Sequence, residues 1–355
     1  MESVFNIDPY SLGREEKRDV LGEKLKYLTK LHYDKCIEYK RIMDSFGKNS
    51  DNNVLENFLY IPVGMFKDMD LKSINDDQIV KTMTSSGTSG QKVSKIYLDR
   101  NTAANQQKVL VKIVSSFTGK SRLPMLIIDS PAVIKNRQMF SARGAGILGF
   151  SILASDRKYA LDEDMKLDID GIKDFLKKHS GEKILLFGFT FMIWQYFYKE
   201  LLKNPGQIDL SNGIMIHGGG WKKIQNEAVD SPIFKAELTK VCGITKVYDY
   251  YGMVEQTGCI YMECECGHLH TSVFSDVITR KIDDFSPCDY GEEGVIQVLS
   301  MLPESYPGHS ILTEDKGVIL GEDDCQCGRL GKYFKITGRI KNAEVRGCSD
   351  TYEQK

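Results

Sequence analysis

The hydrophobic positions in the first part of the chain follow the period of a helix. Between residues 13 and 46, side chains of one predicted face recur at intervals of three and four: Leu21, Leu25, Leu28, His32, Cys36, Tyr39, Met43 and Phe46. This spacing predicts a long amphipathic helix that packs on a hydrophobic core. We therefore expect residues 1–60 to form an N-terminal helical segment packed on the core.

The middle of the chain alternates short apolar runs with amphipathic segments. The apolar runs, which are suited to buried strands, cover 95–99, 125–129, 183–189, 213–219 and 246–252. Amphipathic stretches such as 170–179 and 190–203 lie between them. Strands that alternate with helices predict an α/β fold with a largely parallel sheet.

The apolar runs become shorter beyond about residue 270. This change predicts a smaller, β-rich and more antiparallel region. We accordingly divide the chain after its N-terminal segment into an α/β core at residues 61–335 and a hinge-like C-terminal arm at 336–355.

Composition and charge exclude several classes of protein. The 355 residues are 41% hydrophobic and 27% charged, with a formal net charge of -2. This balance lacks the basic excess of a nucleic-acid-binding protein, and no apolar run approaches the roughly 20 residues that span a bilayer. The N-terminal residues lack the basic and apolar regions of a signal peptide. We expect a cytoplasmic protein whose cysteines are reduced.

The stretch from Thr84 to Lys92, TSSGTSGQK, combines hydroxyl side chains with two glycines beside an expected strand. The backbone N–H groups of a tight glycine-rich turn, together with hydroxyls, suit phosphate oxygens. The stretch matches neither the P-loop nor the nucleophile-elbow pattern. From these residues alone, a phosphate-binding loop and an ordinary serine-rich turn remain equally open.

Two motifs resemble those of the adenylate-forming enzymes, the superfamily of acyl-CoA synthetases and their relatives. SSGTSG is similar to their phosphate-binding signature, which implies ATP contacts from Ser85, Ser86, Gly87, Thr88, Ser89 and Gly90. YDYYGMVEQTG is similar to their adenine motif. By that resemblance Tyr251 stacks on adenine, Gly252 lets the backbone approach it, and Glu255 holds Mg²⁺ beside the phosphates. The usual threonine of this motif is Val254 here, which removes one hydroxyl contact.

Three further stretches are similar to motifs of the same superfamily and follow the same order. MIHGGGWKK resembles the glycine turn that borders the nucleotide base and contains Gly219. LTEDKG resembles the motif whose aspartate binds the ribose hydroxyls, which implies Asp315. ITGRIKN resembles the hinge segment, in which Arg339 reaches the nucleotide. The resemblance implies an N-terminal-type adenylate-forming domain with layered α/β subdomains and a smaller β-rich subdomain.

Most of the chain, from about residue 55 onward, resembles the acyl-protein synthetases of fatty acid reductase systems, the LuxE family. IPVGMFKDMDL, HGGGWKK and the ending AEVRGCSDTYEQK carry this resemblance. Typical adenylate-forming enzymes have a large C-terminal lid with a catalytic lysine, which we do not expect in the residues that follow Arg339. The resemblance implies that ATP activates a fatty acid as acyl-AMP, that Cys348 then accepts the acyl group, and that a partner reductase receives it.

The roles of several basic residues stay open. Lys222, Lys341 and Lys67 are candidates for the cation that replaces the lid lysine, and each is equally suited to a solvated surface position. His217 either lines the substrate site for the acid or is a hydrogen-bonded structural histidine.

Two cysteine-rich stretches, CECGHLH and CQCG, lie about sixty residues apart. Thiolates suit tetrahedral Zn²⁺, as do the imidazoles of the neighbouring His268 and His270. A structural zinc site and a set of free thiols remain equally open. The candidate zinc ligands are Cys264, Cys266, Cys325 and Cys327.

Two other functions fit parts of the sequence. The first alternative is a ligase that hands the acyl group directly to coenzyme A or to a carrier phosphopantetheine. The second is a catalytically silent, zinc-containing partner subunit, which only Val254 supports.

GAGILG at 144–149 matches a dinucleotide-binding fingerprint, but no expected strand directly precedes it. We therefore predict that these glycines permit close packing or border the acyl channel.

Overall fold

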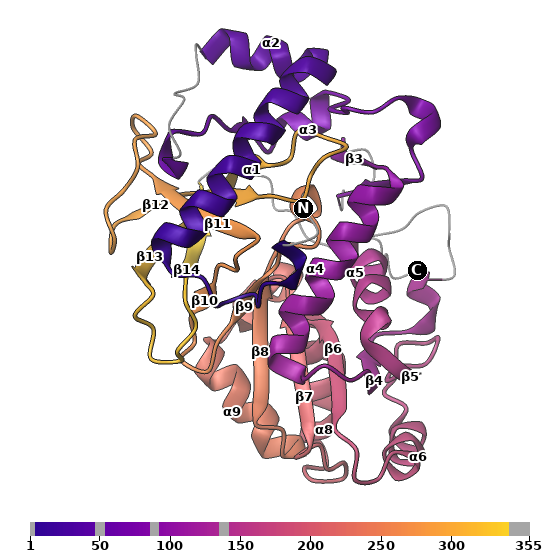
Figure 1. The fold of residues 1–355 in the computed structure, drawn as a ribbon. Coiled ribbons are helices and arrows are strands. Elements are labelled where there is room, and N and C mark those ends of the chain that lie inside the picture. Colours follow the sequence, from indigo (N-terminus) through magenta and orange to yellow (C-terminus); the bar gives the residue numbers. More distant parts are fainter. Residues whose placement is uncertain (1–3, 47–53, 86–91, 135–141, 341–355) are drawn as a thin grey trace. The chain divides into compact units, whose positions relative to one another are not determined.

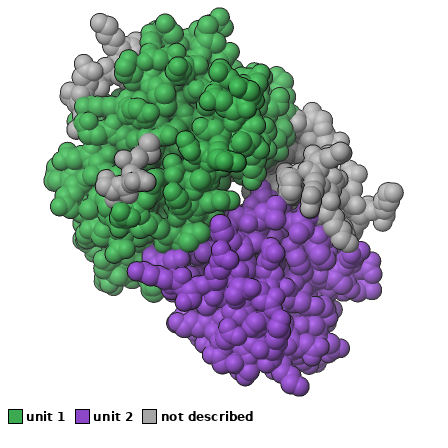
Figure 2. Space-filling view, turned by 45° about the vertical axis from the view of Figure 1, so that its right-hand side comes forward, with its two compact units in different colours: residues 1–85, 90–113, 252–344 green, residues 86–89, 114–251, 345–355 purple. Residues whose placement is uncertain are grey.

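The chain folds into two compact units, unit 1 and unit 2 (Figure 2). The computed structural model describes residues 4–46, 54–85, 92–134 and 142–340. Unit 1 comprises residues 1–85, 90–113 and 252–344, and unit 2 comprises 86–89, 114–251 and 345–355. The N-terminal helical segment thus belongs to the same unit as the β-rich region.

Unit 2 is built on a parallel sheet, as the alternation of apolar runs predicts (Figure 1). Its strands pair in the order β5–β4–β6–β7–β8, and each neighbouring pair is parallel. All residues of β6 and β7 are buried, which is typical of strands covered on both faces. The strands are β4 (Leu123–Ile128), β5 (Ala154–Tyr159), β6 (Ile184–Phe189), β7 (Gly213–Gly218) and β8 (Lys246–Tyr251).

Helices connect these strands. The last of them, α9, begins after Asp230, whose carboxylate accepts a hydrogen bond from the backbone N–H of Ile233. It ends at Gly243, whose φ of 75° is the left-handed conformation that glycine adopts without strain. The α-helices are α5 (Ala142–Phe150), α6 (Ile169–Lys178), α7 (Thr190–Met192), α8 (Lys199–Leu202) and α9 (Ser231–Cys242). A π-helical stretch, η6 (Ile193–Tyr198), joins α7 to α8, and the 3₁₀ turns are η4 (Pro131–Ile134), η5 (Ser151–Leu153) and η7 (Lys222–Glu227).

Unit 1 contains the antiparallel sheet expected in the last third of the chain (Figure 1). Its strands pair in the order β11–β12–β13–β14–β10–β9, and β1 (Ile61–Pro62) pairs with β13 in parallel. The strands are β9 (Tyr261–Glu263), β10 (Leu269–His270), β11 (Ser275–Arg280), β12 (Glu293–Ser300), β13 (Ser310–Glu322) and β14 (Lys332–Arg339). A separate antiparallel pair consists of β2 (Lys81–Thr84) and β3 (Lys95–Leu98).

The predicted single helix at residues 13–46 is two helices, α1 (Arg14–Lys35) and α2 (Ile37–Phe46). The prediction is wrong at Cys36, where the backbone becomes extended with φ -117° and ψ 108°. Buried side chains continue on both sides of this residue, so the hydrophobic period does not reveal the break. The other helices are α3 (Met65–Asp68) and α4 (Arg100–Thr118), with 3₁₀ turns η1 (Val4–Asn6), η2 (Leu55–Asn57), η3 (Asp76–Gln78) and η8 (Val254–Gln256).

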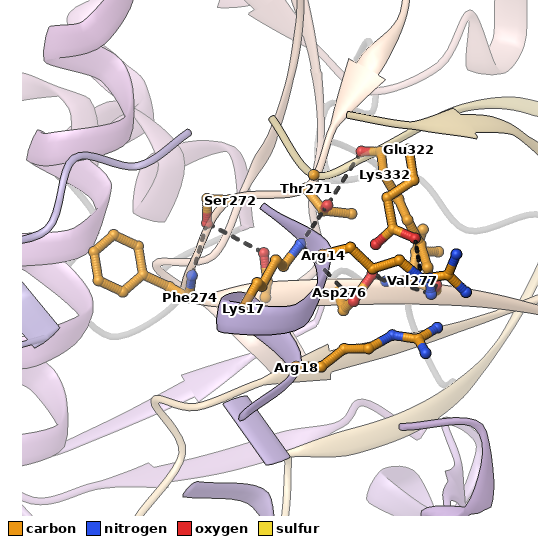
Figure 3. Close-up of polar contacts among 12 residues, drawn as sticks. Arg14, Lys17, Arg18, Thr271, Ser272, Phe274, Asp276, Val277, Glu322 and Lys332 are labelled. Carbon is orange, nitrogen blue, oxygen red and sulfur yellow. Dashed lines mark hydrogen bonds and ion pairs between the residues drawn. The ribbon is translucent and has the colours of Figure 1, made fainter. Parts of the chain in front are cut away.

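A buried charge cluster joins α1 to the sheet of unit 1 (Figure 3). Lys17 Nζ donates a hydrogen bond to Thr271 Oγ1 at 2.6 Å and lies 3.8 Å from Asp276 Oδ2. Lys332 Nζ lies 3.5 Å from Asp276 Oδ1 and donates to Val277 O at 3.0 Å. Burial opposes ionisation of Asp276, but the two ammonium groups outweigh it and hold the pKa of this carboxyl below its usual range. Burial lowers the pKa of Lys17, so the Asp276 carboxylate only partly offsets the cost of burying this ammonium group.

Among the described residues, none of the helices is both long enough and apolar enough to cross a membrane.

Candidate functional site

The segment after β8 carries the residues expected to bind adenine and magnesium. Tyr251 is the last residue of β8 and is half-buried, whereas Gly252 is exposed. Glu255 lies in η8 and is only 4% exposed. The motif thus passes from a strand through a short turn to a buried carboxylate.

The side chains of Tyr306 and Gln256 anchor η8 within unit 1. The Tyr306 hydroxyl donates to Glu255 O at 2.9 Å. Gln256 Nε2 donates to Val298 O at 3.1 Å and to Gly308 O at 2.9 Å. Sequence analysis missed both side chains. Gln256 stands directly after the predicted magnesium ligand, but nothing in the sequence marks Tyr306 as its neighbour in space.

Gly258 ends this motif in a conformation that favours glycine. Its φ is 94°, and a Cβ atom here would lie 2.7 Å from both Cα and O of Gln106 in α4. Real Cβ contacts with backbone are not that short, so the absence of a side chain allows α4 to approach the motif. The glycine that follows Thr257 is therefore a packing requirement of unit 1.

The predicted ribose and hinge residues lie opposite each other in the sheet of unit 1. Asp315 in β13 pairs in register with Arg339 in β14. Arg339 Nε donates to Asp315 Oδ1 at 2.9 Å, and Arg339 Nη2 lies 3.7 Å from Glu314 Oε2. Sequence reasoning singled out both ends of this pair separately, but it did not predict that they contact each other.

Thr313 shapes the backbone that presents Asp315. The Thr313 hydroxyl donates to Ile296 O at 2.8 Å and accepts from the backbone N–H of Asp315 at 3.1 Å. The threonine of LTEDKG thereby ties the motif to β12. Its hydroxyl is needed because both of these backbone groups lie where the register of β12 and β13 shifts, near Val295 and Gln297.

In unit 2, His217 lies near the carboxyl end of the parallel strand β7 and is 4% exposed. Its Nδ1 is 3.0 Å from Thr190 Oγ1 and 3.6 Å from Asp249 Oδ1. Burial lowers the pKa of His217 to about 3, with a smaller contribution from Lys235, so the imidazole is neutral near pH 7. Its Nε2 has no hydrogen-bond partner among the described residues. Of the two ring nitrogens, Nδ1 thus has a hydrogen-bond partner and Nε2 has none among these residues.

The glycine turn after His217 has two distinct requirements. A Cβ atom on Gly218 would lie 2.6 Å from the ring of Tyr250 in β8, so this glycine lets the tyrosine pack. Gly219 is exposed and has a φ of 78°, which favours glycine over other residues. Both glycines belong to the predicted nucleotide turn.

Ser85, the described residue at the start of the predicted phosphate loop, is hydrogen-bonded to Ser94, which lies shortly after the loop. Ser85 Oγ accepts from the backbone N–H of Ser94 at 2.8 Å, and Ser85 N donates to Ser94 O at 3.1 Å. Lys92 Nζ donates to Asp68 Oδ1 at 3.0 Å in an exposed pair. These bonds close the base of the loop above the β2–β3 pair.

Other predicted site residues lie partly or wholly outside the residues that the structure describes. Of the candidate cations, Lys67 is half-buried in α3 and the backbone of Lys222 lies in η7. The predicted site residues outside the described residues are Ser86, Gly87, Thr88, Ser89, Gly90, Lys341 and Cys348.

Three of the four predicted zinc ligands come together in unit 1, and a histidine completes the group. Cys264, Cys325 and Cys327 join His270, with all four potential ligand atoms within 4.8 Å of one another. The remaining predicted ligand, Cys266, is exposed and stands outside this group. The sequence signal for His270 was its place in CECGHLH.

The glycines of GAGILG lie within helix α5, so they form no strand-to-helix turn for a dinucleotide. A Cβ atom on Gly146 would lie 3.1 Å from the ring of Phe189. This contact supports the close-packing interpretation of the motif.

The fold is that of adenylate-forming ligases. It matches an open conformation of 2-hydroxyisobutyryl-CoA ligase in complex with 2-HIB-AMP and CoA with a TM-score of 0.73 and 14% identity, over 94% of this chain and 77% of that chain. It matches ATP-bound MatB from Rhodopseudomonas palustris with a TM-score of 0.50 and 17% identity, over 75% and 49% of the respective chains.

The family model described as "Acyl-protein synthetase, LuxE" matches residues 1–355, and the chain belongs to this family. Two relatives carry the name long-chain-fatty-acid–luciferin-component ligase. The protein from Vibrio harveyi is 23% identical over 99% of this chain and 92% of its own length. That from Aliivibrio fischeri is 23% identical over 98% and 91%. The chain is thus an ATP-dependent acid ligase that forms an acyl-adenylate.

Proposed function

We propose that this enzyme activates a fatty acid with ATP and then carries the acyl group on its own Cys348 to a partner reductase. The match of the acyl-protein synthetase family over the whole chain, including the segment that contains Cys348, carries this proposal. The names of the relatives from Vibrio harveyi and Aliivibrio fischeri support a long-chain fatty acid as substrate.

In the first step a carboxylate oxygen of the acid attacks the α-phosphorus of ATP and pyrophosphate leaves. The two reactants are anions, so positioning and charge neutralisation dominate the catalysis. We assign the ribose hydroxyls to Asp315 and the nucleotide phosphates to Arg339 and the Ser85–Gly90 loop, and we assign adenine stacking to Tyr251. Mg²⁺, when bound, neutralises phosphate charge, and the buried carboxylate of Glu255 is its proposed ligand.

The conformation of the Glu255 segment supports this assignment. Tyr306 donates to the backbone of Glu255, and the Gln256 side chain donates to Val298 O and Gly308 O, so three hydrogen bonds anchor the segment that carries the carboxylate. Preorganisation of this kind lowers the cost of ordering a metal–phosphate site.

In the second step the thiolate of Cys348 attacks the acyl carbonyl and AMP leaves as its anion. The thiol proton passes to solvent. Arg346 stands two residues before Cys348 in the sequence, and a nearby guanidinium favours a thiolate. The thioester keeps the acyl group activated for reduction by the proposed partner.

Two assays separate the steps. Carboxylate-dependent exchange between ATP and pyrophosphate reports the first step, and a panel of acids of different chain length identifies the preferred substrate. Incubation with radiolabelled fatty acid, ATP and Mg²⁺ without added thiol reports self-acylation. We expect Cys348→Ala to retain the exchange and to lose the hydroxylamine-sensitive label.

Cys288→Ala is the matched control, because Cys288 is a free, half-buried cysteine of unit 1 outside every predicted site. It should keep both activities. Undiminished labelling of Cys348→Ala would refute the acyl-cysteine step. Product formation only on addition of coenzyme A or a carrier phosphopantetheine would instead identify the direct-transfer ligase.

A further inference from the structure

Two turns in unit 1 share one sequence pattern and one backbone geometry. Cys264–Gly267 and Cys325–Gly328 both read Cys-x-Cys-Gly. In each turn the glycine N–H donates to the carbonyl of the first cysteine at 2.9 Å, and each glycine has a φ of 77°. In the first turn the backbone N–H of Cys266 also points at Cys264 Sγ, at 3.4 Å. Such N–H groups stabilise a thiolate.

The two turns bring four soft ligand atoms together. Cys264 Sγ lies 4.0 Å from Cys325 Sγ, and Cys327 Sγ lies 3.4 Å from His270 Nε2. A tetrahedral zinc ion, with Zn–S near 2.3 Å and Zn–N near 2.05 Å, requires S–S and S–N separations of about 3.8 and 3.6 Å. These two separations agree with this geometry within about 0.2 Å, and all four ligand atoms lie within 4.8 Å of one another.

The surroundings of these ligands are also ordered. Arg329, which follows the second turn, donates from Nη1 and Nη2 to the carboxylate of Glu265 in the first turn, at 2.5 and 3.2 Å. The ring of Tyr333 stacks on His268 and His270 with centroid separations of 5.0 and 5.7 Å. The two turns are thus held against each other by contacts besides those of the cysteines.

We propose that Cys264, His270, Cys325 and Cys327 bind one structural Zn²⁺. Three thiolates and one imidazole select zinc among common divalent ions, and four protein ligands leave no open position for catalysis. Binding removes one proton from each thiol, and His270 binds as the neutral imidazole through Nε2. The site does not depend on the acyl-transfer chemistry proposed above.

The zinc ion cross-links parts of the sheet that are distant in sequence. The first turn joins β9 to β10, and the second lies in the connection from β13 to β14. β10 pairs with the first residues of β14 through His270 and Tyr333. The ion therefore fixes the beginning of the strand whose last residue is Arg339.

Metal analysis of the purified full-length protein tests the proposal. We expect about one zinc per chain, and replacement by Co²⁺ should give visible d–d bands of a tetrahedral site with thiolate-to-metal charge transfer in the near ultraviolet. His270→Ala and Cys327→Ala should reduce bound zinc at least about tenfold. Cys266→Ala is the matched control, since its thiol lies next to the site but is exposed, and it should keep the full zinc content.

If a variant fails to fold, the proposal can still be tested, because the zinc can be removed from the wild-type protein with a chelator and the protein titrated with Co²⁺. A zinc content below about a tenth of an equivalent, or a wild-type spectrum without tetrahedral bands, would overturn the proposal. A Cys264–Cys325 disulfide in the freshly purified protein, detected by thiol counting, would do so as well. Loss of zinc in Cys266→Ala with retention in His270→Ala would refute the assigned ligand set.

Discussion

Arg339 is paired with Asp315 across two neighbouring strands, through a 2.9 Å hydrogen bond from Nε to Oδ1. The side chains are 36% and 19% exposed. An exposed pair of this kind contributes only about 0–1 kcal/mol to stability, so the pair can open toward a ligand at little cost. The planar fork of guanidinium donors matches phosphate geometry, which suits Arg339 to a nucleotide once the pair opens.

Arg339→Ala should therefore impair nucleotide use without unfolding the protein. We expect kcat/KM for ATP in the pyrophosphate-exchange assay to fall at least about tenfold, while the melting temperature changes by no more than about 2 °C. Lys335→Ala is the control, because Lys335 is an exposed cation on the same strand. Equal losses in the two variants would show that a general positive charge, and not Arg339, is responsible.

Asp276→Asn should destabilise unit 1 strongly. The change leaves the buried ammonium groups of Lys17 and Lys332 without the carboxylate between them, and breaking a buried ion pair costs about 3–5 kcal/mol. Denaturant unfolding measures this loss. As a control, Asp19→Asn alters an exposed carboxylate of α1, the helix that carries Lys17, and should change the free energy of unfolding by less than about 0.5 kcal/mol. A small effect of Asp276→Asn would contradict the buried cluster.

The buried histidines predict a loss of stability in acid. Burial lowers the pKa values of His32 and His217 to about 3. His32 is held as a neutral ring, with Nδ1 2.7 Å from Ser73 Oγ and Nε2 3.0 Å from Pro303 O. The unfolded chain titrates these groups near pH 6.5, so it binds more protons than the folded state between about pH 6.5 and 3. The free energy of unfolding should fall throughout that window as the pH falls.

The size of this effect can be measured by denaturant titrations between pH 7.5 and pH 5. Each neutral histidine adds a slope that approaches about 1.4 kcal/mol per pH unit well below pH 6.5. His32→Asn removes one such group, so the slope should become smaller by up to that amount. An unchanged slope in this variant would contradict the assigned burial of a neutral imidazole.

Gly258→Ala should separate steric from conformational strain. Both Gly258 and Gly206 have positive φ, 94° and 80°, but only Gly258 faces backbone atoms, those of Gln106 at 2.7 Å. Gly206→Ala should cost about 1 kcal/mol, the cost of the left-handed conformation alone. Gly258→Ala should cost at least about 2 kcal/mol more, since backbone must shift. Equal melting temperatures for the two variants would show that the backbone of α4 can shift without a measurable cost in stability.

The α/β class of fold could be predicted because the pattern of apolar residues along the chain reflects which positions are buried. β6 and β7 are buried along their whole length and appear in the sequence as continuous apolar runs. The break at Cys36 was not predictable, because buried positions continue through it. Local φ and ψ changes that keep the same face buried leave no trace in a hydrophobic pattern.

Site residues could be predicted from the sequence where a short motif contains them. Contacts that depend on the tertiary fold could not. Asp315 and Arg339 could each be found from a short motif, but their contact depends on the register of β13 with β14. That His270 and not Cys266 joins the three-cysteine group has the same origin, because the hairpin decides which side chains of CECGHLH face inward. Tyr306 reaches Glu255 from 51 residues away, and no spacing rule connects them.

The cluster around Lys17 also sets an order in which the chain can mature during translation. Lys17 leaves the ribosome long before Asp276 and Lys332, its buried partners, have been synthesised. The stretch 114–251 of unit 2 is continuous and can close its parallel sheet in the meantime. Until residue 332 emerges, the ammonium group of Lys17 stays hydrated and discourages α1 from burying that face elsewhere. Final packing of the first long helix at Lys17 thus has to wait for the synthesis of β14, which supplies Lys332.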